Sequence, residues 1–314
     1  MNLQQFRFVQ EAVRRQLNLT ETAKALFTSQ PGVSKAILEL EAELGIDIFA
    51  RHGKRLKRVT EPGQQVLKSI DLILREVTNL KRIGEEYALQ DAGTLSIATT
   101  HLQARYFLPP ALAQLRQRYP RVQVLMHQGL PDEVTRMLLD DVAEVGLATE
   151  APSVHSDLIT LPCHEWQHVL IVPAGHRLAQ EEPIALAQLA THSLALYQQG
   201  MAGRARIDQA FANAGLKPAV TLEALDSDVI KTGVRLGLGV GIVAEQCMQD
   251  EPPKSDLVAR PLGHLFGANH THLAFKRGVY LRRFVLAFAE MLSPRLNAAL
   301  IERAMQGQGS DHQI

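Results

Sequence analysis

The sequence predicts a mixed fold: a small, mainly helical N-terminal unit ending in a hairpin, then one long helix, then a larger α/β part in two lobes. Three observations predict it. Apolar residues recur every three or four positions over residues 3–44. A similar periodicity returns over residues 66–83, near a coiled-coil spacing. From Gly93 onward, short apolar runs alternate with helical patterns. A chain of 314 residues has the length of about two domains.

The overall composition favours an ordinary globular protein. Lys and Arg balance Asp and Glu, so the net charge of zero does not by itself indicate a nucleic-acid partner. The two cysteines, Cys163 and Cys247, are too far apart for a familiar zinc motif and too few for a disulfide framework. We find no signal-peptide pattern and no apolar run of membrane-spanning length. We therefore expect a cytoplasmic protein with no membrane association.

The first residues predict three helices. Leu3, Phe6, Val9 and Val13 form the apolar side of the first. A second short helix over 18–26 begins at Asn18 or Thr20, which are good N-cap residues. The third runs over 31–44: Pro31 fits a first helical position, and Gly45 is a typical helix end.

A basic hairpin is expected directly after these helices. Five cations lie within eight residues without an acid between them: Arg51, Lys54, Arg55, Lys57 and Arg58. Gly53 supplies the turn between two short extended runs. Helix, turn, helix and basic hairpin together predict a winged helix-turn-helix over residues 1–60.

Such a unit would bind double-stranded DNA through the start of its third helix. Polar residues there would contact base edges and phosphates: Gln30 could read adenine, and Lys35 could reach guanine or a phosphate. Cations of the hairpin would neutralise phosphates. The alternative is a small helical domain with a solvated charge run. The expected DNA-binding residues are Thr28, Ser29, Gln30, Pro31, Ser34, Lys35, Arg51, Lys54, Arg55 and Lys57.

A long linker helix over 61–90 is predicted next, with Thr60 as its N-cap. Its apolar residues would form a seam against another helix: Val66, Ile70, Ile73, Val77, Leu80 and Ile83. Residues 91–304 are predicted to alternate strands and helices on a mostly parallel sheet. We place lobe I at about 91–162 and 266–304, lobe II at about 163–265, and a disordered tail at 305–314.

The sequence resembles the LysR-type transcription regulators, and within them the CysB branch that controls sulfur assimilation. The wider family is marked by residues 3–6, 22–23, 27–35, 40–41, 43–45, 49–51 and 59–63. The resemblance continues through residues 97–101, 103–106, 119–122, 126–129, 148–150, 228–232 and 234–241. Of these, residues 99–106 and 228–241 are far more specific to the branch. The resemblance implies a homotetramer dimerised through the linker helix, and a periplasmic-binding-protein-like effector domain. RNA polymerase is a further candidate partner.

An effector site is expected where a strand meets a helix at residues 99–103. Hydroxyls, an amide and free backbone N–H groups could hold a small anion there, although Thr99 and Thr100 could instead serve only as helix caps. The resemblance implies that Thr100, Gln103 and Thr149 contact a sulfate-like ligand, and that Glu150 and Trp166 line the same cleft. The full expected set is Thr99, Thr100, Leu102, Gln103, Thr149, Glu150, Trp166, Ala202 and Ser227.

Two positions depart from the pattern of the branch. Leu102 and Ala202 stand where it typically has Thr. Each change removes a hydrogen-bond donor, which for a charged ligand is worth roughly 1.5–3 kcal/mol. We therefore expect weak binding of sulfate or an acetylated serine, and a larger or less polar effector such as an organosulfur compound.

Other functions have less support. The glycine-rich run at residues 233–241 lacks dinucleotide-site spacing, so we interpret it as tight packing. His264, His270 and His272 have no carboxylate or cysteine at metal-binding spacing. No nucleophile elbow is present, and Cys163 is expected to be a buried structural residue. We expect no cofactor and no enzymatic activity. An enzyme or solute-binding protein, and a regulator of an aromatic or organic-acid pathway, remain alternatives.

Overall fold

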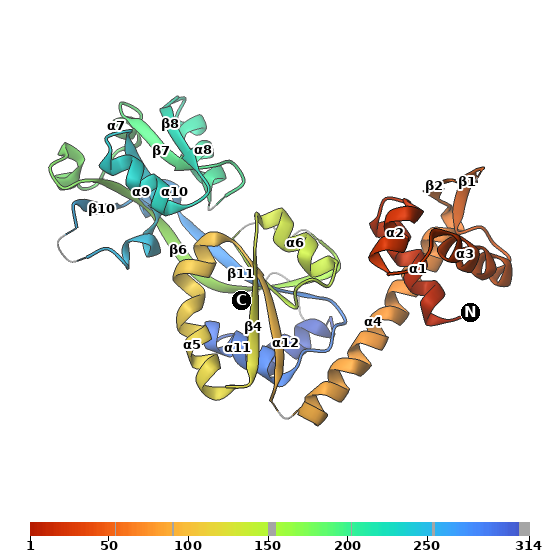
Figure 1. The fold of residues 1–314 in the computed structure, drawn as a ribbon. Coiled ribbons are helices and arrows are strands. Elements are labelled where there is room, and N and C mark those ends of the chain that lie inside the picture. Colours follow the sequence, from red (N-terminus) through yellow and green to blue (C-terminus); the bar gives the residue numbers. More distant parts are fainter. Residues whose placement is uncertain (54, 90, 150–154, 202, 253–254, 308–314) are drawn as a thin grey trace. The chain divides into compact units, whose positions relative to one another are not determined.

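The computed structural model describes residues 1–53, 55–89, 91–149, 155–201, 203–252 and 255–307. Lys54, Glu150 and Ala202, which the sequence placed in binding sites, lie outside the described residues, as does 308–314 of the expected tail. The chain forms two compact units, Met1–Glu85 and Glu86–Ile314. Figure 1 shows the helices and strands of both units. No helix within the described ranges is long and apolar enough to cross a membrane.

The N-terminal unit contains the predicted helices. They are α1 (Leu3–Arg14), α2 (Leu19–Ala25) and α3 (Gln30–Leu44), and Asn18 caps α2. Gly45 ends α3 in the left-handed conformation, with φ 69°. One hydrophobic core joins the three helices to the hairpin and to the start of α4, with Val33, Ile37 and Leu40 of α3 fully buried.

The predicted hairpin and long helix follow. The strands β1 (Phe49–His52) and β2 (Arg55–Val59) pair antiparallel around Gly53. Helix α4 spans Glu61–Leu89, and Thr60 caps it by accepting a hydrogen bond from the Gly63 N–H at 2.9 Å. A β-carbon at Gly63 would lie 2.2 Å from the Ile48 carbonyl oxygen, so glycine is required where α4 starts beside the hairpin.

The C-terminal unit has two lobes. In lobe I, β3 (Gly93–Thr99) pairs parallel with β4 (Val122–Gln128) and β5 (Val145–Ala148). In lobe II, β7 (Ser193–Tyr197) pairs parallel with β8 (Ala219–Ala224) and β9 (Val240–Ala244). Strand β10 (Leu257–Pro261) pairs with β6.

Two strands join the lobes. The sixteen residues of β6 (Leu158–Pro173) pair first with β11 (Ala268–Lys276) and then with β9 and β10 (Figure 1). Among the described residues of this unit, four strand pairs are antiparallel and four are parallel, so the prediction of a mostly parallel sheet is wrong. A buried apolar run has the same composition in either strand direction, so the sequence could not decide this.

Helices and short turns complete the unit. Lobe I has the π-helix η1 (Gln103–Phe107) and helices α5 (Leu108–Arg118), α6 (Pro131–Leu139), α11 (Arg283–Leu292) and α12 (Ala298–Met305). Lobe II has η3 (Arg177–Gln180), α7 (Leu186–Leu189), α8 (Arg204–Asn213), α9 (Ser227–Arg235), η4 (Glu245–Met248) and α10 (Gly263–Phe266). Since α12 reaches Met305, the expected disordered tail cannot begin at that residue.

Three of the four glycines in the run 233–241 pack tightly, as the sequence predicted, whereas Gly237 has open space around it. A β-carbon at Gly241 on β9 would lie 2.5 Å from Ile171 Cγ1, and one at Gly233 on α9 would lie 2.4 Å from Leu222 Cδ2. These glycines let α9 lie against the lobe II sheet. That packing places the start of α9 at the candidate site.

Candidate functional site

The start of α3 presents polar side chains to solvent. The Ser29 hydroxyl caps the helix by accepting a hydrogen bond from the Gly32 N–H at 3.3 Å. Thr28, Ser29, Pro31 and Lys35 are exposed, and Gln30 and Ser34 are partly exposed. The first backbone N–H groups of a helix have no partner inside it, so this end can also accept an anion.

Phe27, at the turn between α2 and α3, is a surface feature that the sequence analysis missed. Its side chain is 98% exposed, and its backbone has a φ of 50°. A bulky residue with positive φ is uncommon and is often linked to function. No pattern in the sequence indicates this conformation, because Phe is an ordinary core residue elsewhere in the chain.

The cations of the hairpin have different environments. Arg55 and Lys57 are exposed on β2. Arg51 instead donates to Glu41 at 2.5 Å, where the carboxylate is only 5% exposed and also accepts from the Ile48 and Phe49 N–H groups. Arg51 therefore helps to hold the hairpin against α3.

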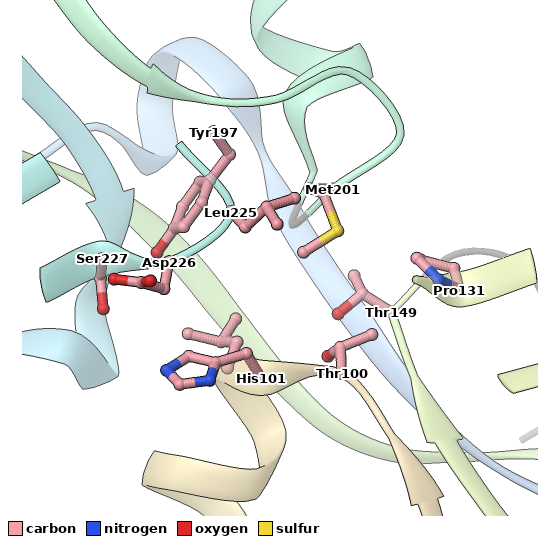
Figure 2. A pocket seen from close by; sticks show the side chains of 10 residues that line it. Thr100, His101, Pro131, Thr149, Tyr197, Met201, Leu225, Asp226 and Ser227 are labelled. Atoms are coloured by element: carbon pink, nitrogen blue, oxygen red, sulfur yellow. The ribbon is translucent and has the colours of Figure 1, made fainter. Parts of the chain in front are cut away.

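The candidate effector pocket lies in the C-terminal unit between the two lobes. Residues from both lobes line it: Thr100, His101, Leu102, Pro131, Thr149, Tyr197, Met201, Leu225, Asp226 and Ser227 (Figure 2). Its cavity measures about 10 Å³, which is room for about one water molecule. A larger ligand would have to move the walls apart.

Four residues of the expected effector set line this pocket. They are Thr100, Leu102, Thr149 and Ser227. The remaining three described members, Thr99, Gln103 and Trp166, are buried and are not part of the lining.

Those buried residues support the pocket from behind. The Thr99 hydroxyl donates to the Leu147 carbonyl oxygen at 3.0 Å. The Gln103 amide donates to Thr271 Oγ1 at 3.0 Å and to Thr149 Oγ1 at 3.4 Å. Gln103 thus holds the Thr149 hydroxyl in place. Gln103 Oε1 and Trp166 Nε1 have no hydrogen-bond partner within the described part of the chain.

Six lining residues were not among the expected set: His101, Pro131, Tyr197, Met201, Leu225 and Asp226. His101 lies inside the strand-to-helix segment that the sequence did single out. Of the lobe II residues, only Asp226 carries a local signal, since it caps α9 by accepting from the Val229 N–H at 2.9 Å.

Comparison with known protein families decides the classification. The model for the LysR substrate binding domain matches residues 88–297. The model for the bacterial regulatory helix-turn-helix protein, lysR family, matches residues 3–64. The chain belongs to the LysR family.

Individual relatives of this LysR-family chain place it within the family. It is 52% identical over 314 residues to the HTH-type transcriptional regulator CysB of Burkholderia cenocepacia, covering 100% of both chains. It is 46% identical over 301 residues to the regulator SsuR of the same species, covering 96% of this chain and 97% of the other. The crystal structure of the cofactor-binding domain of the Cbl transcriptional regulator superposes with a TM-score of 0.66 at 42% identity, covering 70% and 95%. The chain is thus a LysR-type transcription regulator of the CysB-like branch.

The LysR-family pocket is bordered by a polar contact between the lobes. On η1, the Tyr106 hydroxyl lies 3.2 Å from both Ser227 Oγ and Asp228 Oδ1 of α9, and Arg105 lies 3.2 Å from Asp228 Oδ2. Lys231, 5% exposed, also pairs with Asp228 at 3.1 Å. The residues 103–106 and 228–232, which carried the resemblance to the branch, therefore meet in space.

At this border between the lobes, the carboxylate of Asp228 and the cations of Lys231 and Arg105 stabilise each other's charge. Burial raises the pKa of Asp228, but the hydrogen bond and charge of Lys231 and the charge of Arg105 outweigh burial, so the pKa lies below its usual value. For Lys231, burial lowers the pKa, but the hydrogen bond of Asp228 and further partners raise it above its usual value. Both groups are held in their charged forms.

Two groups that suggest other chemistry have ordinary explanations. Cys163 is partly buried, not fully buried as expected, and this burial raises the pKa of its thiol to about 12, which disfavours the reactive thiolate. His101, Asp226 and Asp228 have potential ligand atoms within 4.8 Å of one another. The Asp228 carboxylate, however, is already paired with Arg105 and Lys231, so a metal ion would have to compete with two cations.

Proposed function

We propose that this LysR-type regulator binds promoter DNA through α3 and the hairpin, and controls genes of sulfur assimilation or organosulfur use. It acts in the cytoplasm, by binding and not by catalytic turnover. The relatives named CysB and SsuR and the Cbl domain support the choice of pathway. The observation that carries the proposal is the exposed start of α3, capped by Ser29, in the same unit as a basic hairpin.

The residues of the DNA-binding surface fall into groups with different roles. Gln30 and Lys35 contact base edges, while Thr28, Ser29, Pro31 and Ser34 lie against the flanking sugar-phosphate backbone. Arg55 and Lys57 neutralise phosphates, and the sequence assigns Lys54 the same role. We omit Arg51, because its guanidinium is paired with Glu41. We add Phe27, whose exposed ring can pack against a sugar or a thymine methyl group.

A small anionic or sulfur-containing effector binds between the lobes. The hydroxyls of Thr100, Thr149 and Ser227 supply hydrogen bonds, and Leu102 supplies apolar surface. Because the cavity holds about one water, binding and lobe separation are coupled. The effector therefore selects one lobe arrangement over another, and the DNA-binding units respond.

The working assembly is a homotetramer built as a dimer of dimers. Among the α4 side chains that the structure describes, three aliphatic ones are exposed in the single chain: Leu72 at 51%, Ile73 at 40% and Leu80 at 69%. Pairing of α4 with its copy would bury them. Leu80→Glu should lower the assembly state in sedimentation, whereas the same change at an exposed polar position, Gln65→Glu, should not.

Selection of DNA from a random pool by the full-length protein tests the proposal. We expect one enriched, two-fold related sequence, whose affinity changes when sulfur metabolites are added. No enrichment over random competitor would refute DNA recognition. If a DNA sequence were enriched but its affinity changed only with aromatic or organic acids, the assignment to sulfur metabolism would be refuted in favour of an aromatic or organic-acid pathway.

A further inference from the structure

The carboxylate of Asp226 is an acidic group in the wall of the effector pocket. Asp226 directly precedes α9 in lobe II, and its Oδ1 caps that helix by accepting from the Val229 N–H at 2.9 Å. This hydrogen bond uses one oxygen only. Within the described residues, no ion pair neutralises the carboxylate. The negative charge of Asp226 is therefore available to a ligand.

The rest of the pocket lining does not balance this charge. The described lining contains hydroxyl and apolar side chains and His101, but no Lys or Arg. The neighbouring Asp228 is paired with Arg105 at 3.2 Å and with Lys231 at 3.1 Å, and Lys231 also pairs with Glu251 at 3.2 Å, so these two cations are balanced by two other carboxylates. The lobe II wall consequently bears one net negative charge.

The opposite end of the pocket has a different character. Thr100 and Thr149 lie together on the lobe I side, away from Asp226 and Ser227 (Figure 2). Thr100 directly precedes a helical segment starting at His101, whose first backbone N–H groups favour an anion. One end is thus suited to a negative group and the other to a positive group.

We propose that Asp226 makes the pocket selective for a zwitterion: the anionic group of the effector lies at Thr100 and Thr149, and its ammonium lies between Asp226 and His101. This inference rests on the proposed function, because it concerns the same effector pocket. A doubly negative ion such as sulfate would be repelled by the charge of Asp226 in this partly buried site. A metal ion at the same place is less favoured, because Asp228 already has its cations.

Two probes of matched size test this selectivity by calorimetric titration of the full-length protein. They are 2-aminoethanesulfonate and 2-hydroxyethanesulfonate, which differ only in an ammonium against a hydroxyl group. The native protein should bind the ammonium probe at least about tenfold more tightly, since a charge pair across a few ångströms in a partly buried site is worth that much. Chelator should leave the affinity unchanged.

The variant Asp226→Asn removes the charge and keeps the helix cap, because Asn is an equally good N-cap residue. It should abolish the preference between the two probes and increase the affinity for sulfate. Glu302→Gln, an exposed position on α12, makes the same change in net charge and should alter neither.

Several results would overturn the proposal. The native protein could bind both probes with equal affinity, or bind neither at millimolar concentration. The Asp226→Asn variant could keep the preference for the ammonium probe, or chelator could abolish binding. Failure of the proposed function is a separate result, since the DNA selection does not require either probe.

Discussion

The Tyr106 hydroxyl of lobe I donates a hydrogen bond to the Asp228 carboxylate of lobe II over 3.2 Å. Tyr106 is 8% exposed, and its ring also lies 5.8 Å from the Lys231 ammonium. The contact joins the π-helix after the first strand of lobe I to the helix that begins at the pocket. It therefore connects the pocket to the relative position of the lobes.

Tyr106→Phe should loosen this contact. Loss of one hydrogen bond to a charged group should lower the free energy of unfolding by about 1–3 kcal/mol and increase hydrogen exchange of the α9 amides. Tyr280→Phe is the matched control, since its hydroxyl donates to Glu86 at 2.9 Å, away from α9. Equal exchange of α9 in both variants would contradict a role for Tyr106 in holding the lobes.

Acid should destabilise the C-terminal unit through Asp228. Its pKa in the folded state lies below the ordinary value of 3.8, so its contribution is present above that pH and is lost as pH falls through the folded pKa. Urea unfolding between pH 7 and pH 3 should therefore show a steeper loss of stability for the native protein than for Asp228→Asn. Parallel curves would show that the ion pairs of Asp228 add nothing to stability.

Gln30→Ala and Lys57→Ala should weaken DNA binding in different ways. Loss of Gln30 should cost about 1–3 kcal/mol on the preferred sequence and relax the preference at one base pair. Loss of Lys57 should weaken binding to every sequence and reduce the salt slope by about one. Lys81→Ala on α4 is the control, with no expected change. Identical losses on all sequences for both variants would contradict the assigned roles.

Glu41 should be essential to the N-terminal unit. Its carboxylate, 5% exposed, accepts from two backbone N–H groups and from Arg51. Glu41→Ala should lower the free energy of unfolding by about 3 kcal/mol, because it leaves a partly buried cation and two N–H groups without an acceptor. Glu39→Ala, which removes an exposed pair with Lys35 at 3.7 Å, should cost less than about 1 kcal/mol. Similar melting temperatures for Glu41→Ala and Glu39→Ala would contradict the larger contribution of Glu41 to stability.

Leu102→Thr should improve sulfate binding. Leu102 lines the pocket and is 5% exposed, and a hydroxyl there would supply the donor that the CysB-like branch typically has. A donor to an anion is worth roughly 1.5–3 kcal/mol, which corresponds to about a tenfold gain in affinity or more. Leu236→Thr, at a side chain that is 72% exposed outside the pocket, should change nothing. If calorimetric titration gave the same sulfate affinity for Leu102→Thr as for the native protein, the missing hydroxyl at position 102 would not be the cause of weak sulfate binding.

Sequence determined the parts of this protein that depend on local patterns. Helical periodicity, Pro31 and Gly45 located α3, and the charge run with Gly53 located the hairpin, because caps, turns and amphipathic faces are encoded within a few residues. The strand-to-helix junction at residues 99–103 was likewise located from its own residues, whereas its interpretation as an effector site depended on the family resemblance. Short-range physics was sufficient for each of these features.

Tertiary structure decided what depends on residues far apart in the chain. It set the direction of β6 and β11, paired Arg51 with Glu41, and buried Gln103 behind Thr149. Above all, it brought Asp226 of lobe II to the pocket that begins at Thr100 of lobe I. No local pattern encodes that proximity, because it arises only when strands from both lobes pair into one sheet through β6 and β11.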